Sequence, residues 1–164
     1  MTETAKTADP RPSLVVMITT YVVGGIGLAI GISTVNQTPS DLSLSCLLGV
    51  GAVGILSFIR HAILNRSDAA RMGWDYGKRN NFQIEVGLAN LAWGVVAVLA
   101  VVLGWGLGVE AALFLTLGIY ITSLAAMNLL SPGDQRREIR PLLATAIFGA
   151  ILLYLGIVGM CAAT

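Results

Sequence analysis

Five stretches of mostly apolar sequence, each long enough to cross a lipid bilayer, constrain this chain more than any other feature. A transmembrane helix needs about 20 mostly apolar residues, and such stretches span residues 14–35, 42–64, 82–107, 110–130 and 141–162. Only 12% of the residues are charged, about half the share of a soluble domain. We therefore expect an all-α fold, in which residues 1–13 form a polar tail and residues 14–164 form one membrane bundle of five helices.

The positive charges predict how this bundle is oriented. With five helices, every Lys and Arg falls on one side of the membrane, in the tail, in or beside the second loop, or in the fourth loop. The two loops on the other side contain none, which matches the excess of positive charge found on the cytoplasmic side of membrane proteins. We expect a multi-pass protein of the bacterial inner membrane, with its amino terminus inside and its carboxyl terminus outside. The ten residues are Lys6, Arg11, Arg60, Arg66, Arg71, Lys78, Arg79, Arg136, Arg137 and Arg140.

Glycines recur along the faces of several of these helices. In lipid, helices associate through close packing of small residues. We therefore expect helix–helix contacts, within one chain or between chains, at Gly27, Gly31, Gly87, Gly94, Gly104 and Gly118. At 100° per residue, Gln83 and Asn90 share the glycine face of the third helix. An alternative is that these two side chains line a small pore or ligand cleft.

The second loop and its flanking helix ends hold most of the remaining polar residues. A cytoplasmic cleft is one interpretation, bounded by Arg60, His61, Gln83, Glu85 and Asn90. In this hypothesis Glu85 pairs with Arg60 or His61.

Ordinary structural roles are the competing interpretation for this region. Cations such as Arg60 and His61 complement the negative end of a helix dipole. Ser67 or Asp68 can cap a short helix, and Asn80 with Gln83 resembles a capping box. The short cytoplasmic segment between the second and third helices is amphipathic. Its aromatic residues suit the membrane interface; the expected interface anchors are Trp74 and Tyr76.

The pattern RH, then GW, then FQIEVGLANLAWGV resembles an uncharacterised family of small bacterial multi-pass membrane proteins, catalogued as a domain of unknown function. The resemblance covers about a third of the chain, and FQ-x-EVG-x-AN is its most specific part. It implies a family but no activity, cofactor or partner. The matching positions are Arg60, His61, Gly73, Trp74, Phe82, Gln83, Glu85, Gly87, Asn90 and Gly94.

Several chemistries are disfavoured. One His in the whole chain cannot build a multi-His metal site or bis-His haem ligation, so we expect neither metal nor cofactor. The chain has no phosphate-binding loop. Ion-coupled transport usually needs charges inside the membrane, and none lies near the middle of a predicted helix.

The two cysteines, Cys46 and Cys161, lie near the outer ends of the second and fifth predicted helices. Disulfides persist on that side of the membrane, so these residues are either two small packed thiols or a disulfide between helices.

The favoured hypothesis is a non-enzymatic membrane protein that acts through helix contacts, as a homo-oligomer or as an accessory subunit of a membrane assembly. Its partners would be the bilayer, anionic lipids at the basic loop and another membrane protein or copy, but not nucleic acid. A second hypothesis is a small transporter, channel or lipid-binding module with a cytoplasm-facing site around Glu85 and Asn90. The third is an interfacial lipid or quinone enzyme, in which His61 and Glu85 would act as acid and base.

Overall fold

The computed structural model describes residues 7–75, 77–130 and 139–164, and within these ranges every regular element is helical. Five helical segments are long and apolar enough to cross a membrane, as predicted. This is the fold of a multi-pass membrane protein. In chain order the elements are α1 (Arg11–Thr34), α2 (Ser43–Cys46), η1 (Leu47–Ala52), α3 (Val53–Phe58), η2 (Ile59–Ile63), α4 (Asn65–Arg71), α5 (Asn81–Val102), α6 (Leu107–Leu130) and α7 (Ile139–Ala163).

The second membrane-spanning segment, Ser43–Ile63, combines α-helical and π-helical turns. The elements α2, η1, α3 and η2 follow one another without a break. In η2 the N–H of Leu64 donates to the carbonyl oxygen of Ile59 at 2.9 Å, five residues back. π-Helical turns inside α-helices are frequent at functional sites, and η2 carries Arg60 and His61.

Two helix boundaries differ from the sequence prediction around residues 103–106. α5 ends at Val102 rather than at residue 107, and α6 begins at Leu107 rather than at residue 110. Gly104 and Gly106 have φ values of +63° and +93°, which favour glycine and end a helix. Gly104 therefore lies in the turn between α5 and α6, outside both helices, so its predicted role in helix packing is wrong.

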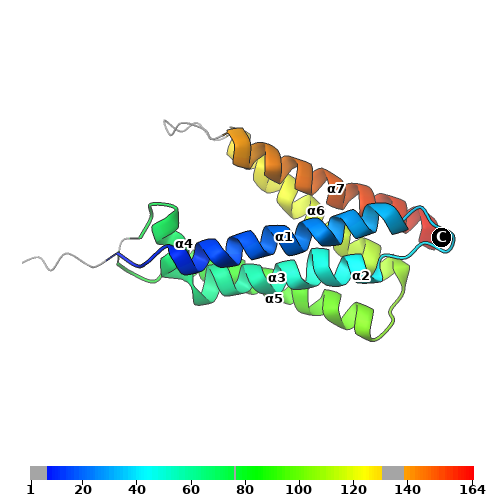
Figure 1. Cartoon of the computed structure of the whole chain (residues 1–164), viewed down its shortest axis with the longest axis horizontal. Helices are drawn as coiled ribbons and strands as arrows, with labels where there is room; N and C mark the ends of the chain where they lie inside the picture. Colours follow the sequence, from blue (N-terminus) through cyan, green and yellow to red (C-terminus); the bar gives the residue numbers. More distant parts are fainter. Residues whose placement is uncertain (1–6, 76, 131–138) are drawn as a thin grey trace, which may run out of the picture.

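The bundle consists of a three-helix layer and a helical pair (Figure 1). α1, the second span and α5 lie side by side, whereas α6 and α7 pack mainly against each other. The pair meets the layer near α2 and η1, where Phe114 and Leu117 of α6 are at most 1% exposed. The rings of Trp93 in α5 and Tyr120 in α6 pack against each other at a tilt of 51°, with their centroids 5.1 Å apart.

Small residues bring the helices into close contact within this one chain. A Cβ added to Gly27 would lie 2.6 Å from the Gly49 nitrogen, and a Cβ on Gly87 would lie 2.9 Å from the Ala62 Cβ. A Cβ on any other predicted packing glycine except Gly104 would also lie too close to a neighbouring helix. The remaining three are Gly31 against Ser45, Gly94 against Gly51, and Gly118 against Leu153.

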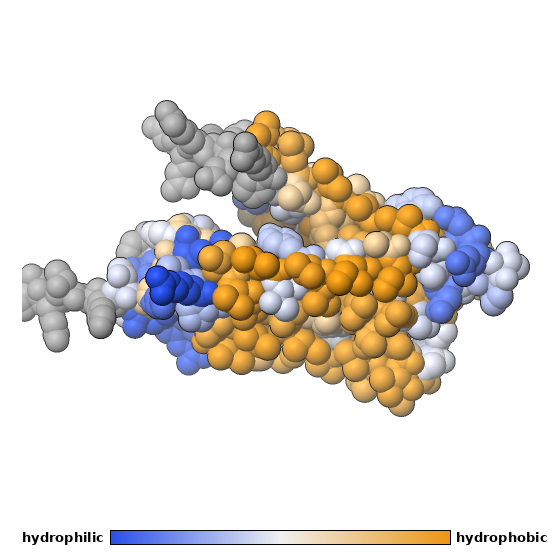
Figure 2. All heavy atoms as spheres, viewed as in Figure 1, coloured by the Kyte–Doolittle hydropathy of each residue, from blue (hydrophilic) through white to orange (hydrophobic). Residues whose placement is uncertain are grey.

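On the face of the molecule shown in Figure 2, apolar side chains form a broad belt with polar groups at both ends. One polar end carries the start of α1, α4 and the start of α5 (Figure 1). We call this the α4 end. The other carries the turns between α1 and α2 and between α5 and α6. The belt matches the hydrocarbon layer of a bilayer, and the α4 end holds the largest group of buried polar side chains.

Candidate functional site

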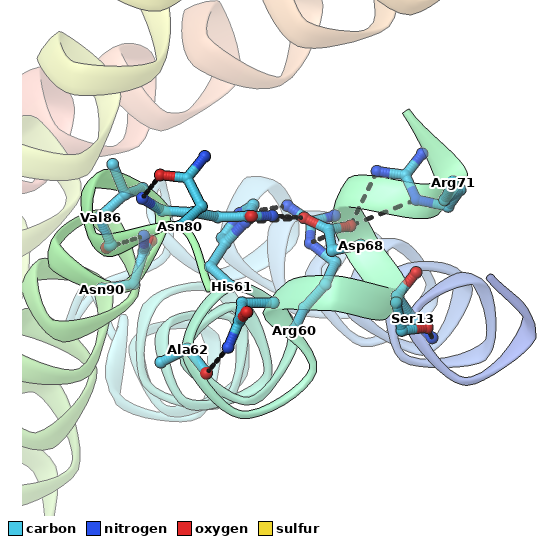
Figure 3. Close-up of polar contacts among 12 residues, drawn as sticks. Ser13, Arg60, His61, Ala62, Asp68, Arg71, Asn80, Val86 and Asn90 are labelled. Carbon is cyan, nitrogen blue, oxygen red and sulfur yellow. Dashed lines mark hydrogen bonds and ion pairs between the residues drawn. The ribbon is translucent and has the colours of Figure 1, made fainter. Parts of the chain in front are cut away.

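Asp68, in the middle of α4, is the centre of the polar α4 end (Figure 3). Its side chain is 0% exposed. The carboxylate lies 3.0 Å from His61 Nδ1 and 3.0 Å from Arg71 Nη2, and it accepts a 2.7 Å hydrogen bond from Gln83 Nε2. Arg60 Nε lies 3.9 Å from Oδ1. Four side chains from η2, α4 and α5 therefore meet at one acid, and we call these five residues the Asp68 cluster.

The tautomer of a neutral His61 follows from its contact with Arg60. Arg60 Nη2 lies 2.7 Å from His61 Nε2, and a guanidinium can only donate hydrogen bonds. Nε2 must then accept, so the proton of a neutral imidazole is on Nδ1. That nitrogen is the one beside Asp68 Oδ2. The chain Arg60–His61–Asp68 thus fixes one tautomer of His61.

Asp68 stays ionised in this environment. Burial would by itself raise the pKa of its carboxyl, because an apolar surrounding disfavours the charged form. The hydrogen bond from His61, the charge of Arg60 and the hydrogen bond from Arg71 act in the opposite direction and hold the pKa below its ordinary value. The cluster is therefore an ion-paired junction that joins three elements.

The side chain of Gln83 bonds to a different residue from the one predicted. The side chain of Asn80 accepts a hydrogen bond from the backbone N–H of Gln83 at 3.3 Å and caps α5. The Gln83 side chain, however, is directed to Asp68 instead of completing a capping box.

The structure brings together three of the five residues proposed for a cleft, namely Arg60, His61 and Gln83. Glu85 is exposed on α5 and is not part of the cluster. Asn90 is buried about two turns along α5 from Gln83, where its Nδ2 donates to the Val86 carbonyl oxygen at 2.7 Å (Figure 3).

Sequence reasoning missed the central role of Asp68, to which it gave only a capping role. The available indication was its position. Asp68 precedes Arg71 by three residues in a short helix, a spacing at which helical side chains meet. Its three other partners come from other elements, which a local pattern does not show.

The start of the chain is tied to α4 and to the loop after it. Ser67 Oγ accepts from the Ser13 N–H at 3.1 Å and donates to the Asp9 carbonyl oxygen at 2.6 Å. Asp75 accepts from the Ala8 N–H at 2.8 Å and pairs with Arg66 at 3.2 Å. The hydrogen bond from the Ala8 N–H has the largest effect and lowers the pKa of Asp75, and the hydrogen bond from the Arg66 guanidinium lowers it further.

A groove with a volume of about 740 Å³ opens beside the cluster, between the end of the second span, α4 and the start of α5. We call it the α4 groove. Its lining combines apolar residues with two arginines, an asparagine and a serine. The lining residues are Phe58, Ala62, Ile63, Leu64, Asn65, Arg66, Ser67, Arg79, Ile84 and Leu88.

The opposite end of the bundle has a smaller polar contact. Ser43 Oγ donates to Glu110 Oε1 at 2.9 Å, and Glu110 is 4% exposed in the first turn of α6. Cys46 is buried nearby, whereas Cys161 is exposed, and both are free. The disulfide considered from the sequence is therefore not formed in the structure.

Of the two expected interface anchors, Trp74 and Tyr76, the structure describes only Trp74. Trp74 is 49% exposed just after α4, and its role as an interface anchor stays a prediction. Tyr76 lies outside the described residues. Across residues 7–75, 77–130 and 139–164, no group of three or more His, Cys, Asp or Glu side chains could hold a metal ion.

A family model covers most of the polypeptide, residues 12–159, including all the elements that form the Asp68 cluster and the α4 groove. The chain belongs to a family of unknown function, DUF6790. The resemblance to an uncharacterised family is thus confirmed. No curated protein and no solved structure matches the chain.

Proposed function

We propose that this DUF6790 protein is a non-enzymatic multi-pass protein of the bacterial inner membrane that acts by self-association through α1. Its amino terminus lies inside and its carboxyl terminus outside. The orientation is supported by the positive charges, because alternating spans place all ten Lys and Arg of the chain on one side.

The observation that carries the proposal is a row of small residues on the outward face of α1. Gly25, Ala29 and Ser33 are all exposed and are spaced four residues apart. A Cβ built on Gly25 would meet no atom within 4 Å. Small residues at four-residue spacing let two membrane helices approach closely, and this row has no cover within the described chain.

A second row of small residues, on the opposite face of α1, packs against other helices of the same chain. Gly24, Gly27 and Gly31 are buried, and a Cβ on any of them would come within 3 Å of a neighbouring helix or its side chains. These contacts are made inside one chain. The glycines at 27 and 31 therefore serve the fold, and the exposed row remains available for a second helix.

A second copy of the chain fits this row best. Because the charge bias inserts every copy in the same direction, two α1 helices from different copies run parallel in the membrane. Parallel copies related by a two-fold axis present the same surface to each other, so a single row of small residues is self-complementary.

The geometry favours this hypothesis over the other two. A transport site around Glu85 and Asn90 would need these side chains to converge, but Glu85 is exposed and Asn90 bonds within α5. For an acid–base enzyme, His61 and Glu85 would have to meet, whereas His61 faces Asp68.

The experiment is a measurement of self-association in lipid nanodiscs or bilayers, by native mass spectrometry and by energy transfer between labelled chains. We expect a dimer for the wild type and a several-fold smaller dimer fraction for Gly25→Leu and Ala29→Leu. Ala92→Leu is the matched control, because Ala92 is an exposed small residue on α5. A monomeric wild type, or a dimer that Gly25→Leu and Ala29→Leu leave intact, would rule out the proposal.

A further inference from the structure

We infer that the α4 groove binds one anionic phospholipid from the membrane leaflet that meets the α4 end. The lining of the groove combines apolar and basic side chains. Phe58, Ile63, Ile84 and Leu88 supply apolar walls, while Arg66 and Arg79 supply positive charge. A phospholipid combines the two matching parts, acyl chains and a phosphate, in one molecule.

The depth of the groove fits the layers of a bilayer. α5 begins at Asn81, so Leu88 lies seven residues further along the helix, about 10 Å deeper at 1.5 Å per residue. The headgroup region of one leaflet is about 5 to 8 Å thick. With the start of α5 in the headgroup region, Arg79 lies at the level of lipid phosphates and Leu88 at the level of acyl chains.

The charges at the groove suit an anion. Arg79 is exposed and has no salt bridge to any residue of the described ranges. The guanidinium of Arg66 is already paired with Asp75, through contacts of 3.2 and 3.3 Å, so Arg79 supplies the net positive charge beside the groove. None of the ten lining residues, which all belong to the described chain, is acidic. Arginine binds phosphate in preference to uncharged groups because its N–H groups match the phosphate oxygens.

The apolar walls favour a lipid over a soluble phosphate compound. Ile63 and Leu88 are 62% and 52% exposed, and they line the same groove as the two arginines. Acyl chains would cover these side chains, whereas a soluble phosphate would leave them uncovered. Burial of apolar area and pairing of charge then favour the same ligand.

The test compares lipids on the purified full-length protein in a neutral maltoside detergent. Added phosphatidylglycerol should raise the midpoint of thermal unfolding more than phosphatidylcholine, and native mass spectrometry should show one retained phosphatidylglycerol. Arg79→Gln should weaken this binding about fivefold, the effect of one cation near an anionic headgroup. Leu88→Trp, which fills the groove without changing charge, should also reduce it.

Two control variants separate the groove from general effects. Arg11→Gln removes an exposed charge at the same end, away from the groove, and Leu99→Trp adds the same bulk at an exposed site further along α5. Both should bind phosphatidylglycerol as the wild type does. Each variant is compared with its own lipid-free midpoint, so a loss of stability is not read as a loss of binding.

Three results would overturn the inference. The first is equal stabilisation by phosphatidylcholine and phosphatidylglycerol. The second is equal stabilisation by glycerol 3-phosphate, which would indicate a soluble ligand. The third is unchanged binding in both Arg79→Gln and Leu88→Trp, which would place the lipid elsewhere.

Discussion

Gln83 Nε2 donates a 2.7 Å hydrogen bond to Asp68 Oδ2 and thereby joins the first turn of α5 to the middle of α4. The two residues are 15 positions apart, and the loop between them contains two glycines with positive φ, Gly73 and Gly77. Both side chains are buried. With the bonds from Ser67 to Ser13 and Asp9 and the contact between Asp68 and His61, this hydrogen bond holds α4 against α1, η2 and α5.

Asp68→Asn should destabilise the protein strongly. Asparagine keeps the shape of the side chain but removes the charge that pairs with Arg60 and Arg71, whose side chains are only 16% and 24% exposed. Removing one member of a buried ion pair costs about 3 to 5 kcal/mol, and because both arginines keep some contact with water we expect about 3 kcal/mol. Denaturant unfolding in detergent measures this change.

Glu85→Gln is the matched control for this prediction. It removes the charge of an exposed carboxylate on the neighbouring helix, and exposed substitutions usually change stability by less than about 0.5 kcal/mol. If both variants changed the free energy of unfolding equally, the Asp68 cluster would not be the junction described above.

The stability that Asp68 contributes should disappear in acid. Its pKa in the folded protein is lowered, whereas in the unfolded chain an aspartate has a pKa of about 3.9. The contribution is therefore present above about pH 4 and is lost as the pH falls further, through the folded-state pKa. The difference in unfolding free energy between wild type and Asp68→Asn should shrink from pH 6 to pH 3. A constant difference would contradict the lowered pKa.

The membrane-spanning helices were predictable because the thickness of a bilayer sets their length and composition. The exact position of the turn between α5 and α6 was not. Which glycine ends α5 depends on φ, and Gly104 was assigned to helix packing although its φ is +63°. Composition marks a turn, but backbone dihedrals decide where the helix stops.

The site was predictable only where the contacts are local. Asn80 caps α5 through a residue three positions away, which a sequence pattern can show. Arg60 and His61 are adjacent, and successive residues of an α-helix point about 100° apart. Their convergence on Asp68 occurs in the π-helical segment η2, whose presence no apolar periodicity indicated.

Gly54→Ala should force α3 and α5 apart. A Cβ at this position would lie 2.6 Å from the Asn90 carbonyl oxygen and 2.7 Å from the Gly94 Cα. Both atoms belong to the backbone, so relief requires movement of a helix. Overpacking of this kind costs about 1 to 3 kcal/mol, and the thermal unfolding midpoint should fall accordingly. Gly108→Ala, whose Cβ would lie 3.7 Å from the Ala163 Cβ, an ordinary contact, should leave the midpoint unchanged or higher.

Ser67→Ala should loosen the start of α1. The first N–H groups of a helix have no partner within it, and α1 has no side-chain cap of its own at Pro10. Ser67 of α4 supplies one partner, since its Oγ accepts from the Ser13 N–H at 3.1 Å. Loss of one such hydrogen bond costs about 1 kcal/mol, so the Ser13 amide should exchange with solvent deuterium about fivefold faster. Ser13→Ala removes only the hydroxyl that bonds to Pro10 and should leave exchange at residue 13 nearly unchanged; equal acceleration in both variants would show that Ser67 does not cap α1.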